Sequence, residues 1–275
     1  MGADPTIRRA AVLGSPIAHS LSPLLHTAGY AAAGLSDWSY DAVEVVESGL
    51  AGFVEALDAS WRGLSLTMPL KEVAFAVATD VSEVARRAQA INTLVRRADG
   101  GWDADNTDVH GMVASLRDVE HSGRARVIGA GATARSAVLA LRELGVRHVE
   151  VAARRVEAAE SLTAFAREQG MPGRTVPLAE WALVPPPLVV STVPAAAGQG
   201  LVATLPASPE QLDVTLFDVV YAPWPSPLAT GVEARGGVAI SGLEMLIHQA
   251  ARQFELFTGL PGDVAAMRAA VRDRP

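Results

Sequence analysis

The stretch Arg126-Val127-Ile128-Gly129-Ala130-Gly131-Ala132-Thr133-Ala134 joins a short strand to a helix that is rich in Ala and Leu. It follows the pattern G-x-G-x-x-A, in which the first glycine allows a tight turn and the second lets backbone N–H groups approach a pyrophosphate. The small third residue lets the helix pack closely on the sheet. A helix N-terminus also carries partial positive charge, so this stretch predicts a dinucleotide-binding βαβ unit.

The end of the next strand indicates which dinucleotide fits. Folds that select NAD place an Asp or Glu there, on the ribose 2′-hydroxyl. This chain has Ala152-Ala153-Arg154-Arg155 instead. A guanidinium can donate paired hydrogen bonds to a 2′-phosphate, so we predict NADP(H), with Arg154 as the main contact. The alternative for either arginine is a solvated surface position.

The alternation of strands and helices extends from this turn in both directions. Downstream, we expect strands at 148–152, 188–192, 216–220 and 237–240, and helices at 132–144, 157–169, from 243 and from 261. Upstream, we expect strands at 10–13, 38–46, 63–67 and 91–97, and helices at 22–33, 49–57, 71–90 and 107–119. This order predicts two α/β units.

The composition excludes several kinds of protein. Hydrophobic residues make up 49% of the 275 residues and charged residues 19%, which is ordinary for a folded protein and not for a disordered one. The net charge of −7 provides no basic field, so we expect no nucleic-acid partner. The absence of cysteine excludes disulfides and thiolate metal sites, and it fits a cytoplasmic setting.

We expect neither a metal site nor a membrane span. The histidines are scattered, and their spacing matches no ligand set. The uncharged stretch 181–209 is long enough to cross a bilayer, but it contains six prolines. We therefore interpret it as strand and loops.

Polar side chains gather at the ends of the elements expected in the first unit. They are Ser20, Ser22, Thr67, Lys71, Asn92 and the run Asp105-Asn106-Thr107-Asp108. Because small ligands bind at strand ends in open α/β sheets, this group could hold a polyhydroxylated acid. Each residue also has a simpler interpretation, since Ser22 could cap a helix and Asp108 could be a first-turn anion.

These polar residues belong to a series of motifs along the chain. The motifs are Gly14-Ser15-Pro16-Ile17-Ala18-His19-Ser20-Leu21-Ser22-Pro23, Leu66-Thr67-Met68-Pro69-Leu70-Lys71, Ala90-Ile91-Asn92-Thr93, Asp105-Asn106-Thr107-Asp108, the glycine-rich turn, Phe217-Asp218-Val219-Val220-Tyr221 and Gly242-Leu243-Glu244-Met245-Leu246-Ile247-His248-Gln249-Ala250. In order and spacing, these motifs together resemble the shikimate dehydrogenase family. The chain departs from many relatives at Ser65 (Asn), at Ala132 (Gly) and at Ala153-Arg154-Arg155 (Asn-Arg-Thr).

The resemblance implies NADPH-dependent, reversible reduction of 3-dehydroshikimate to shikimate in aromatic amino acid biosynthesis. It implies that Lys71 and Asp108 are the catalytic pair. Its implied substrate contacts are Ser20 and Ser22 on the carboxylate, Thr67, Asn92 and Gln249 on the ring hydroxyls or around the carboxylate, and Tyr221 nearby. Its implied cofactor contacts are Gly129, Ala130, Gly131, Ala132, Thr133, Arg154, Arg155, Val219, Gly242 and Glu83.

The expected fold has two α/β domains with the active site in a cleft between them. Residues 1–107, with helices of 238–275 packing back on them, are the expected substrate-binding domain, and 108–237 are the expected NADP-binding Rossmann-like domain. The expected partners are small molecules, and the chain is expected to be a monomer or a homodimer.

Reduction of a carbonyl by hydride needs one group that supplies a proton to the new alkoxide and one that orients it. The Lys71 ammonium and the Asp108 carboxylate suit these roles, but the sequence leaves open which of them transfers the proton. Quinate or aminoshikimate dehydrogenase is the alternative within the same family. A nucleotide-binding regulator without turnover is disfavoured, because both residues are present.

Overall fold

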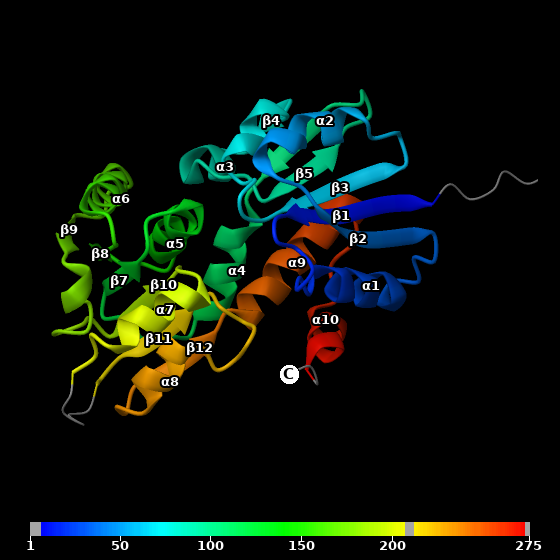
Figure 1. Cartoon of the computed structure of the whole chain (residues 1–275). Helices are drawn as coiled ribbons and strands as arrows, with labels where there is room; N and C mark the ends of the chain where they lie inside the picture. Colours follow the sequence, from blue (N-terminus) through cyan, green and yellow to red (C-terminus); the bar gives the residue numbers. More distant parts are fainter. Residues whose placement is uncertain (1–6, 207–211, 273–275) are drawn as a thin grey trace, which may run out of the picture. The chain divides into compact units, whose positions relative to one another are not determined.

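The computed structural model describes residues 7–206 and 212–272, and these residues form two compact units (Figure 1). The first unit contains residues up to 111 together with those from 246 onward, and the second contains 112–245. Each unit has one six-stranded sheet with helices against it. The prediction of an α/β fold is therefore confirmed. Residues 1–6 and 273–275 of the predicted first domain, and 207–211 of the predicted second, lie outside the described residues.

The sheet of the first unit is mixed. Its strand order is β2 (Trp38–Glu44), β1 (Arg8–Gly14), β3 (Trp61–Leu66), β5 (Thr93–Arg96), β6 (Trp102–Asp105) and β4 (Asp80–Val81). β1 pairs in parallel with β2 and with β3, whereas β5 runs antiparallel to both β3 and β6. The polar residues that follow β3 and precede β5 therefore meet at one end of two neighbouring strands, which brings Thr67 and Asn92 to the same edge.

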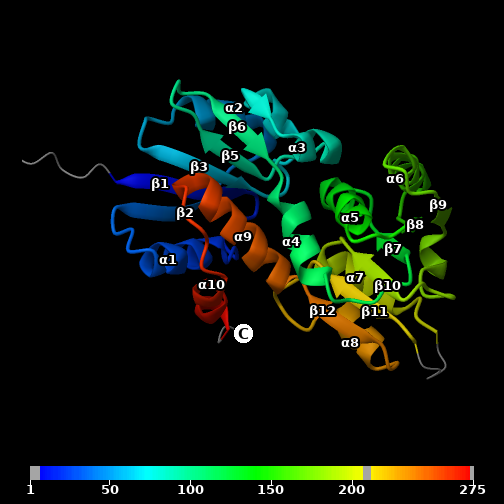
Figure 2. The ribbon, with the colours of Figure 1, turned by 180° about the vertical axis from the view of Figure 1, so that it is seen from behind.

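Helices cover both faces of this sheet. On one face lie α1 (Ser22–Ala32) and α10 (Val264–Val271), which pack against each other, and α9 (Leu243–Thr258) (Figure 2). The Phe257 side chain of α9 lies against Gly63 of β3. The other face holds a core to which α2 (Leu50–Glu55) and α3 (Glu83–Ala88) contribute buried side chains. α4 (Thr107–Leu116) follows β6 directly. The first turn of α4 therefore starts at the edge where Asn92 lies.

The helix predicted over 71–90 is wrong, because only α3 (Glu83–Ala88) is α-helical in this segment. The structure has the 3-10 turn η2 (Val73–Ala76), the short strand β4 and α3 there. The apolar spacing in this segment fits a helix, but β4 pairs with β6 instead, and Ser82 then starts α3 by accepting a hydrogen bond from the Ala85 N–H at 3.1 Å. β6 was not predicted, although its alternation of buried residues with two aspartates is typical of a half-buried strand.

The sheet of the second unit is entirely parallel. Its order is β12 (Val238–Ser241), β11 (Thr215–Asp218), β10 (Leu188–Ser191), β7 (Arg124–Ile128), β8 (His148–Ala152) and β9 (Gly173–Val176). From β7 the chain proceeds outward through α5 (Ala132–Glu143) and α6 (Val156–Glu168). It then returns to β10 and proceeds the other way through α7 (Ala195–Val202) and α8 (Pro227–Glu233). The direction in which successive strands are added to the sheet thus reverses between β7 and β10. In such folds, ligands bind at the strand ends where this reversal occurs.

The predicted strand within 181–209 is present as β10, whereas α7 was not predicted. Pro194 lies at the N-cap of α7, where it interrupts no helical hydrogen bond. Residues 207–209 of that stretch lie outside the described residues. Within 7–206 and 212–272, no helix is both long enough and apolar enough to cross a membrane.

Candidate functional site

Lys71 and Asp108 form a close ion pair in the first unit. The distance from Lys71 Nζ to Asp108 Oδ2 is 2.6 Å, and the two side chains are 14% and 6% exposed. Lys71 lies in the loop after β3, where its carbonyl accepts from the Ile91 N–H, and Asp108 lies in the first turn of α4. Because an ammonium has three N–H donors, the bond to Asp108 leaves donors for a substrate oxygen.

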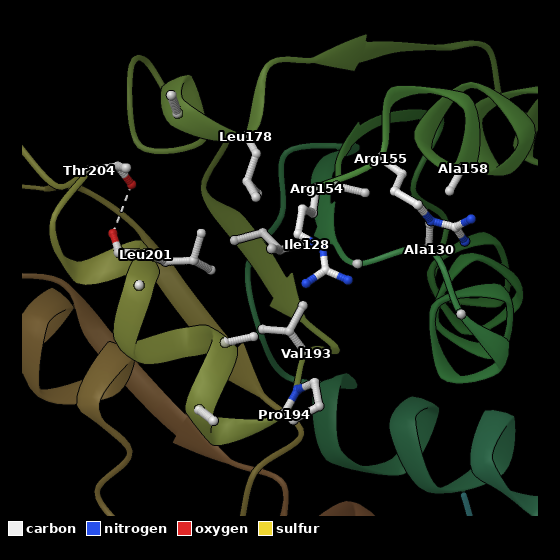
Figure 3. A pocket seen from close by; sticks show the side chains of 17 residues that line it. Ile128, Ala130, Arg154, Arg155, Ala158, Leu178, Val193, Pro194, Leu201 and Thr204 are labelled. Carbon is white, nitrogen blue, oxygen red and sulfur yellow. Dashed lines mark hydrogen bonds between the residues drawn. The ribbon is translucent and has the colours of Figure 1, made fainter. Parts of the chain in front are cut away.

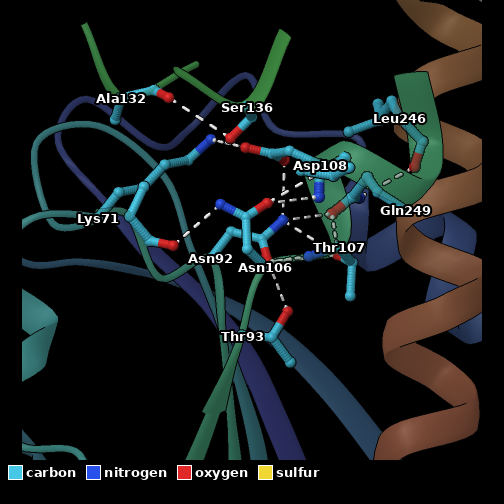
Figure 4. Close-up of polar contacts among 12 residues, drawn as sticks. Lys71, Asn92, Thr93, Asn106, Thr107, Asp108, Ala132, Ser136, Leu246 and Gln249 are labelled. Atoms are coloured by element: carbon cyan, nitrogen blue, oxygen red, sulfur yellow. Dashed lines mark hydrogen bonds and ion pairs between the residues drawn. The ribbon is translucent and has the colours of Figure 1, made fainter. Parts of the chain in front are cut away.

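Asn92 connects this pair to the start of α4 (Figure 4). Its Nδ2 donates to Asp108 Oδ1 at 2.8 Å and to Thr107 Oγ1 at 3.0 Å, while its Oδ1 accepts from the Thr107 N–H at 2.8 Å. Gln249 of α9 completes the group, with Oε1 at 3.5 Å from Asn92 Nδ2. Both oxygens of the buried Asp108 carboxylate thus have a donor, which fixes the carboxylate against Lys71.

A layer of buried hydrogen bonds behind Asn92 was not predicted. Gln253 Nε2 donates to the Asn92 carbonyl at 3.0 Å and to Thr93 Oγ1 at 2.9 Å, and its Oε1 accepts from Ser65 Oγ at 2.8 Å. Ser65 in turn accepts from Tyr40 Oη at 2.6 Å. The sequence contains one signal for this layer. Gln249 and Gln253 are four residues apart, so they lie on the same face of a helix.

The two serines expected to contact the substrate lie together before and at the start of α1. The Ser22 N–H donates to Ser20 Oγ at 3.3 Å, and Ser22 is 4% exposed. Thr67 follows β3, and its N–H donates to the Leu13 carbonyl at 2.9 Å. Its methyl group lies so close to Gly14 that an added Cβ there would come within 2.4 Å of it.

The second unit contains a pocket of about 750 Å³ at the point where the strand order reverses (Figure 3). Its lining includes Gly129, Ala130 and Gly131 after β7. Gly129 has φ +109°, and an added Cβ would lie 2.3 Å from Thr192 Oγ1, so this position requires glycine. No side chain caps α5, and a Cβ added at Gly131 would meet nothing within 4 Å, which leaves room for a pyrophosphate at the helix N-terminus.

Two cations lie at the same pocket. Arg154 and Arg155 line it and are exposed, and the described residues include no carboxylate partner for either. Figure 3 shows the Arg154 guanidinium pointing into the pocket between Ile128 and Val193, with that of Arg155 on the side of Ala158. An apolar pocket with two unpaired guanidinium groups fits a dinucleotide that carries a 2′-phosphate.

The other expected cofactor residues do not line this pocket. Ala132 and Thr133 form the first turn of α5. Val219 and Gly242 lie together after β11 and β12, since a Cβ on Gly242 would lie 2.2 Å from the Val219 carbonyl oxygen. Glu83 belongs to the first unit, in the first turn of α3, where it pairs with Arg87.

Tyr221 is the one expected substrate contact that belongs to the second unit. It follows β11 by three residues and is partly buried. The remaining expected contacts, Ser20, Ser22, Thr67, Asn92 and Gln249, all belong to the first unit together with Lys71 and Asp108.

Comparisons with known proteins agree with the resemblance. A model of the shikimate dehydrogenase substrate-binding domain matches residues 12–94, and a model of the shikimate 5′-dehydrogenase C-terminal domain matches 242–272. A curated relative, shikimate dehydrogenase (NADP(+)) of Methylobacterium radiotolerans, is 39% identical over 91% of each chain. A second, from Synechococcus, is 36% identical over 96% of this chain and 92% of its own.

Solved structures extend the similarity to the whole fold. Shikimate dehydrogenase of Mycobacterium tuberculosis has a TM-score of 0.86 and 42% identity, covering 96% of this chain and 99% of its own. The Thermus thermophilus enzyme in complex with NADP(H) and shikimate has a TM-score of 0.81 and 32% identity, covering 96% and 98%. From the identity and the nearly complete coverage of these relatives, it follows that the chain belongs to the shikimate dehydrogenase family.

Proposed function

We propose that this protein catalyses the NADPH-dependent, reversible reduction of 3-dehydroshikimate to shikimate in aromatic amino acid biosynthesis. The relatives named above carry this activity in their names, and the Thermus thermophilus relative binds both NADP(H) and shikimate. In this chain, the ion pair of Lys71 and Asp108, nearly buried and 2.6 Å long, is the observation that carries the proposal.

NADPH, when bound, supplies the hydride for the carbonyl carbon. Lys71 donates a hydrogen bond to the carbonyl oxygen, stabilises the negative charge that develops there and holds a proton for the new alkoxide. Asp108 keeps the ammonium oriented and charged, because its Oδ2 accepts from Lys71 while Asn92 holds its Oδ1. In the reverse direction the same pair takes up the proton of the substrate hydroxyl.

The remaining polar groups of the first unit bind the substrate in this proposal. Ser20 and Ser22 hold its carboxylate with their hydroxyl groups. Thr67, Asn92 and Gln249 contact its ring hydroxyls or the surroundings of its carboxylate, and Tyr221 is the remaining proposed substrate contact. A site built from donors and acceptors in this way rejects analogues whose hydroxyl pattern differs, because its own polar groups would be left without partners.

The pocket of the second unit binds the cofactor in this proposal. The backbone of Gly129 to Thr133 contacts the pyrophosphate, and Arg154 and Arg155 pair with the 2′-phosphate. Val219 and Gly242 lie beside the nicotinamide. The support is the open N-terminus of α5 and the two unpaired guanidinium groups at the pocket.

We further propose that the protein works in the cytoplasm, on small molecules, as a monomer or a homodimer. A chain without cysteine is suited to a reducing compartment. Its net charge of −7 is unsuited to a nucleic-acid partner. Sedimentation of the purified protein distinguishes the two oligomeric states.

Substrate preference tests the proposal. We expect NADP⁺ to be reduced with shikimate at a kcat/KM at least about 100-fold above that with quinate. Equal or higher kcat/KM with quinate, or with an amino analogue, would assign the chain to the alternative activity of the same family. If none of these substrates supports the reduction of NADP⁺, the proposal is wrong.

A further inference from the structure

A buried ion pair in the parallel sheet of the second unit has no part in the proposed chemistry. Arg126 of β7 and Glu150 of β8 occupy paired positions, and both are 1% exposed. Glu150 Oε2 accepts from Arg126 Nε at 2.9 Å and from Nη2, while Oε1 accepts from Arg174 Nη2 of β9 at 2.9 Å. Burial alone would raise the pKa of Glu150, but hydrogen bonds from Arg126 and Arg174 lower it, so the pair is charged.

The free side of the Arg126 guanidinium reaches the segment after β9. Its Nη1 donates to the carbonyl of Trp181, and its Nη2 lies 3.4 Å from the carbonyl of Val184. This segment contains η3 (Leu178–Glu180), and Leu178 and Ala179 line the cofactor pocket. Arg126 therefore ties the backbone next to that lining to the centre of the sheet.

Trp181 extends the connection to a second part of the pocket lining. Its indole is 0% exposed, and its Nε1 donates to Thr204 Oγ1 at 2.8 Å. Thr204 in turn donates to the Leu201 carbonyl at the end of α7 at 2.8 Å, a bond that Figure 3 also shows. Leu201 and Thr204 both line the pocket. Glu150 is thus connected through Arg126 and the Trp181 residue to both parts of the lining, Leu178 with Ala179 and Leu201 with Thr204.

We propose that Arg126, held by Glu150, is a positioning residue for the cofactor: it fixes the apolar wall formed by Leu178, Ala179, Leu201 and Thr204 against the base and ribose of NADP. The inference rests on the proposed cofactor pocket. The same pocket is lined by Arg154 and Arg155, which in the proposed function pair with the 2′-phosphate.

Stability alone is a poor reason for a buried ion pair in this sheet. Replacing such a pair by apolar residues of similar volume is often neutral or stabilising, because removing two charges from water is costly. The contacts from Arg126 to two main-chain carbonyls are what an apolar pair could not provide. A wall held in this way stays in its binding geometry before the cofactor arrives, which reduces the ordering that binding requires.

Equilibrium binding of NADP⁺ to the purified full chain tests this role. The double variant Arg126→Met/Glu150→Met removes both charges together and leaves no unpaired buried ion. We expect its Kd for NADP⁺ to rise about tenfold, equal to roughly 1.4 kcal/mol, while kcat at saturating NADP⁺ and KM for shikimate stay within about twofold. Trp181→Phe, which keeps an aromatic ring but removes the indole N–H together with the second ring, is expected to raise the same Kd by about threefold.

Arg174→Met is the matched control, because Arg174 also binds Glu150 but donates to neither the Trp181 nor the Val184 carbonyl. We expect it to leave the Kd unchanged. A Kd unchanged in both the double variant and Trp181→Phe, or raised equally by Arg174→Met, would overturn the inference. Because binding is measured without substrate, a wild type that binds NADP⁺ but does not oxidise shikimate would refute the proposed activity and leave this test intact.

Discussion

Arg154→Ala should weaken the preference for NADP⁺ over NAD⁺, while Arg155 remains at the pocket. The guanidinium is exposed at the pocket and has no carboxylate partner among the described residues, so removing it leaves no buried charge behind. A charge-assisted hydrogen bond contributes about 1.5–3 kcal/mol, and the open position favours the lower half of this range. At about 1.4 kcal/mol per tenfold, KM for NADP⁺ should rise by about 10- to 40-fold.

The assay compares initial rates of shikimate oxidation with NADP⁺ and with NAD⁺, each titrated to saturation. Because NAD⁺ lacks the 2′-phosphate, its KM should change by less than about twofold, and kcat with either cofactor should be retained. Arg142→Ala removes the same charge from the exposed C-terminal turn of α5, and it should change neither KM. If Arg154→Ala raised KM for NADP⁺ and KM for NAD⁺ by the same factor, the reasoning would be refuted.

Three further perturbations follow from the structure. Gly129→Ala should raise Kd for NADP⁺ at least about tenfold in equilibrium titrations, because the left-handed backbone and Thr192 leave no space for a Cβ. Gln253→Met should lower the free energy of unfolding by about 2 kcal/mol in urea titrations, and it should also lower kcat, because the Asn92 carbonyl keeps only the Leu66 N–H as a donor and the buried Ser65 Oγ loses its acceptor. Burial lowers the pKa of His26 from 6.5 to about 3. The unfolded chain therefore binds the extra proton between these values, and the free energy of unfolding should fall as the pH drops from 6.5 towards 3. His26→Phe, which keeps a ring against Tyr40, should flatten that fall, and an unchanged slope would exclude His26 as its cause.

The sequence was most informative where local rules agree with the tertiary environment. The turn at Gly129 follows the short strand that ends in Val127-Ile128 and precedes an Ala-rich helix, and the structure has β7, the turn and α5 at that place. Lys71, Asn92 and Asp108 were expected at element ends, and the structure joins them by hydrogen bonds. Each of them belongs to a short motif near the start or end of an element: Lys71 lies in the loop after β3, Asn92 directly before β5 and Asp108 in the first turn of α4.

Contacts between distant segments could not be predicted from the sequence. Gln253 and Ser65 are hydrogen-bonded although they are far apart in the chain, and only the packing of α9 on the sheet brings them together. Arg126 in β7 has no neighbour in sequence that suggests a buried partner, since Glu150 comes from the next strand of the sheet. A helix was expected over 71–90 because the apolar residues there have helical spacing, but the pairing of β4 with β6 makes part of this segment a strand.

The rate of shikimate oxidation by NADP⁺ in Lys71→Met and Asp108→Asn tests the central claim most directly. Both substitutions nearly preserve side-chain size and remove one member of the ion pair. We predict that each lowers kcat by about 10³-fold while Kd for NADP⁺ stays within about twofold of wild type, and that the double variant is little worse than either single one. A Lys71→Met protein that retains kcat within about tenfold of wild type would contradict the assignment of this pair.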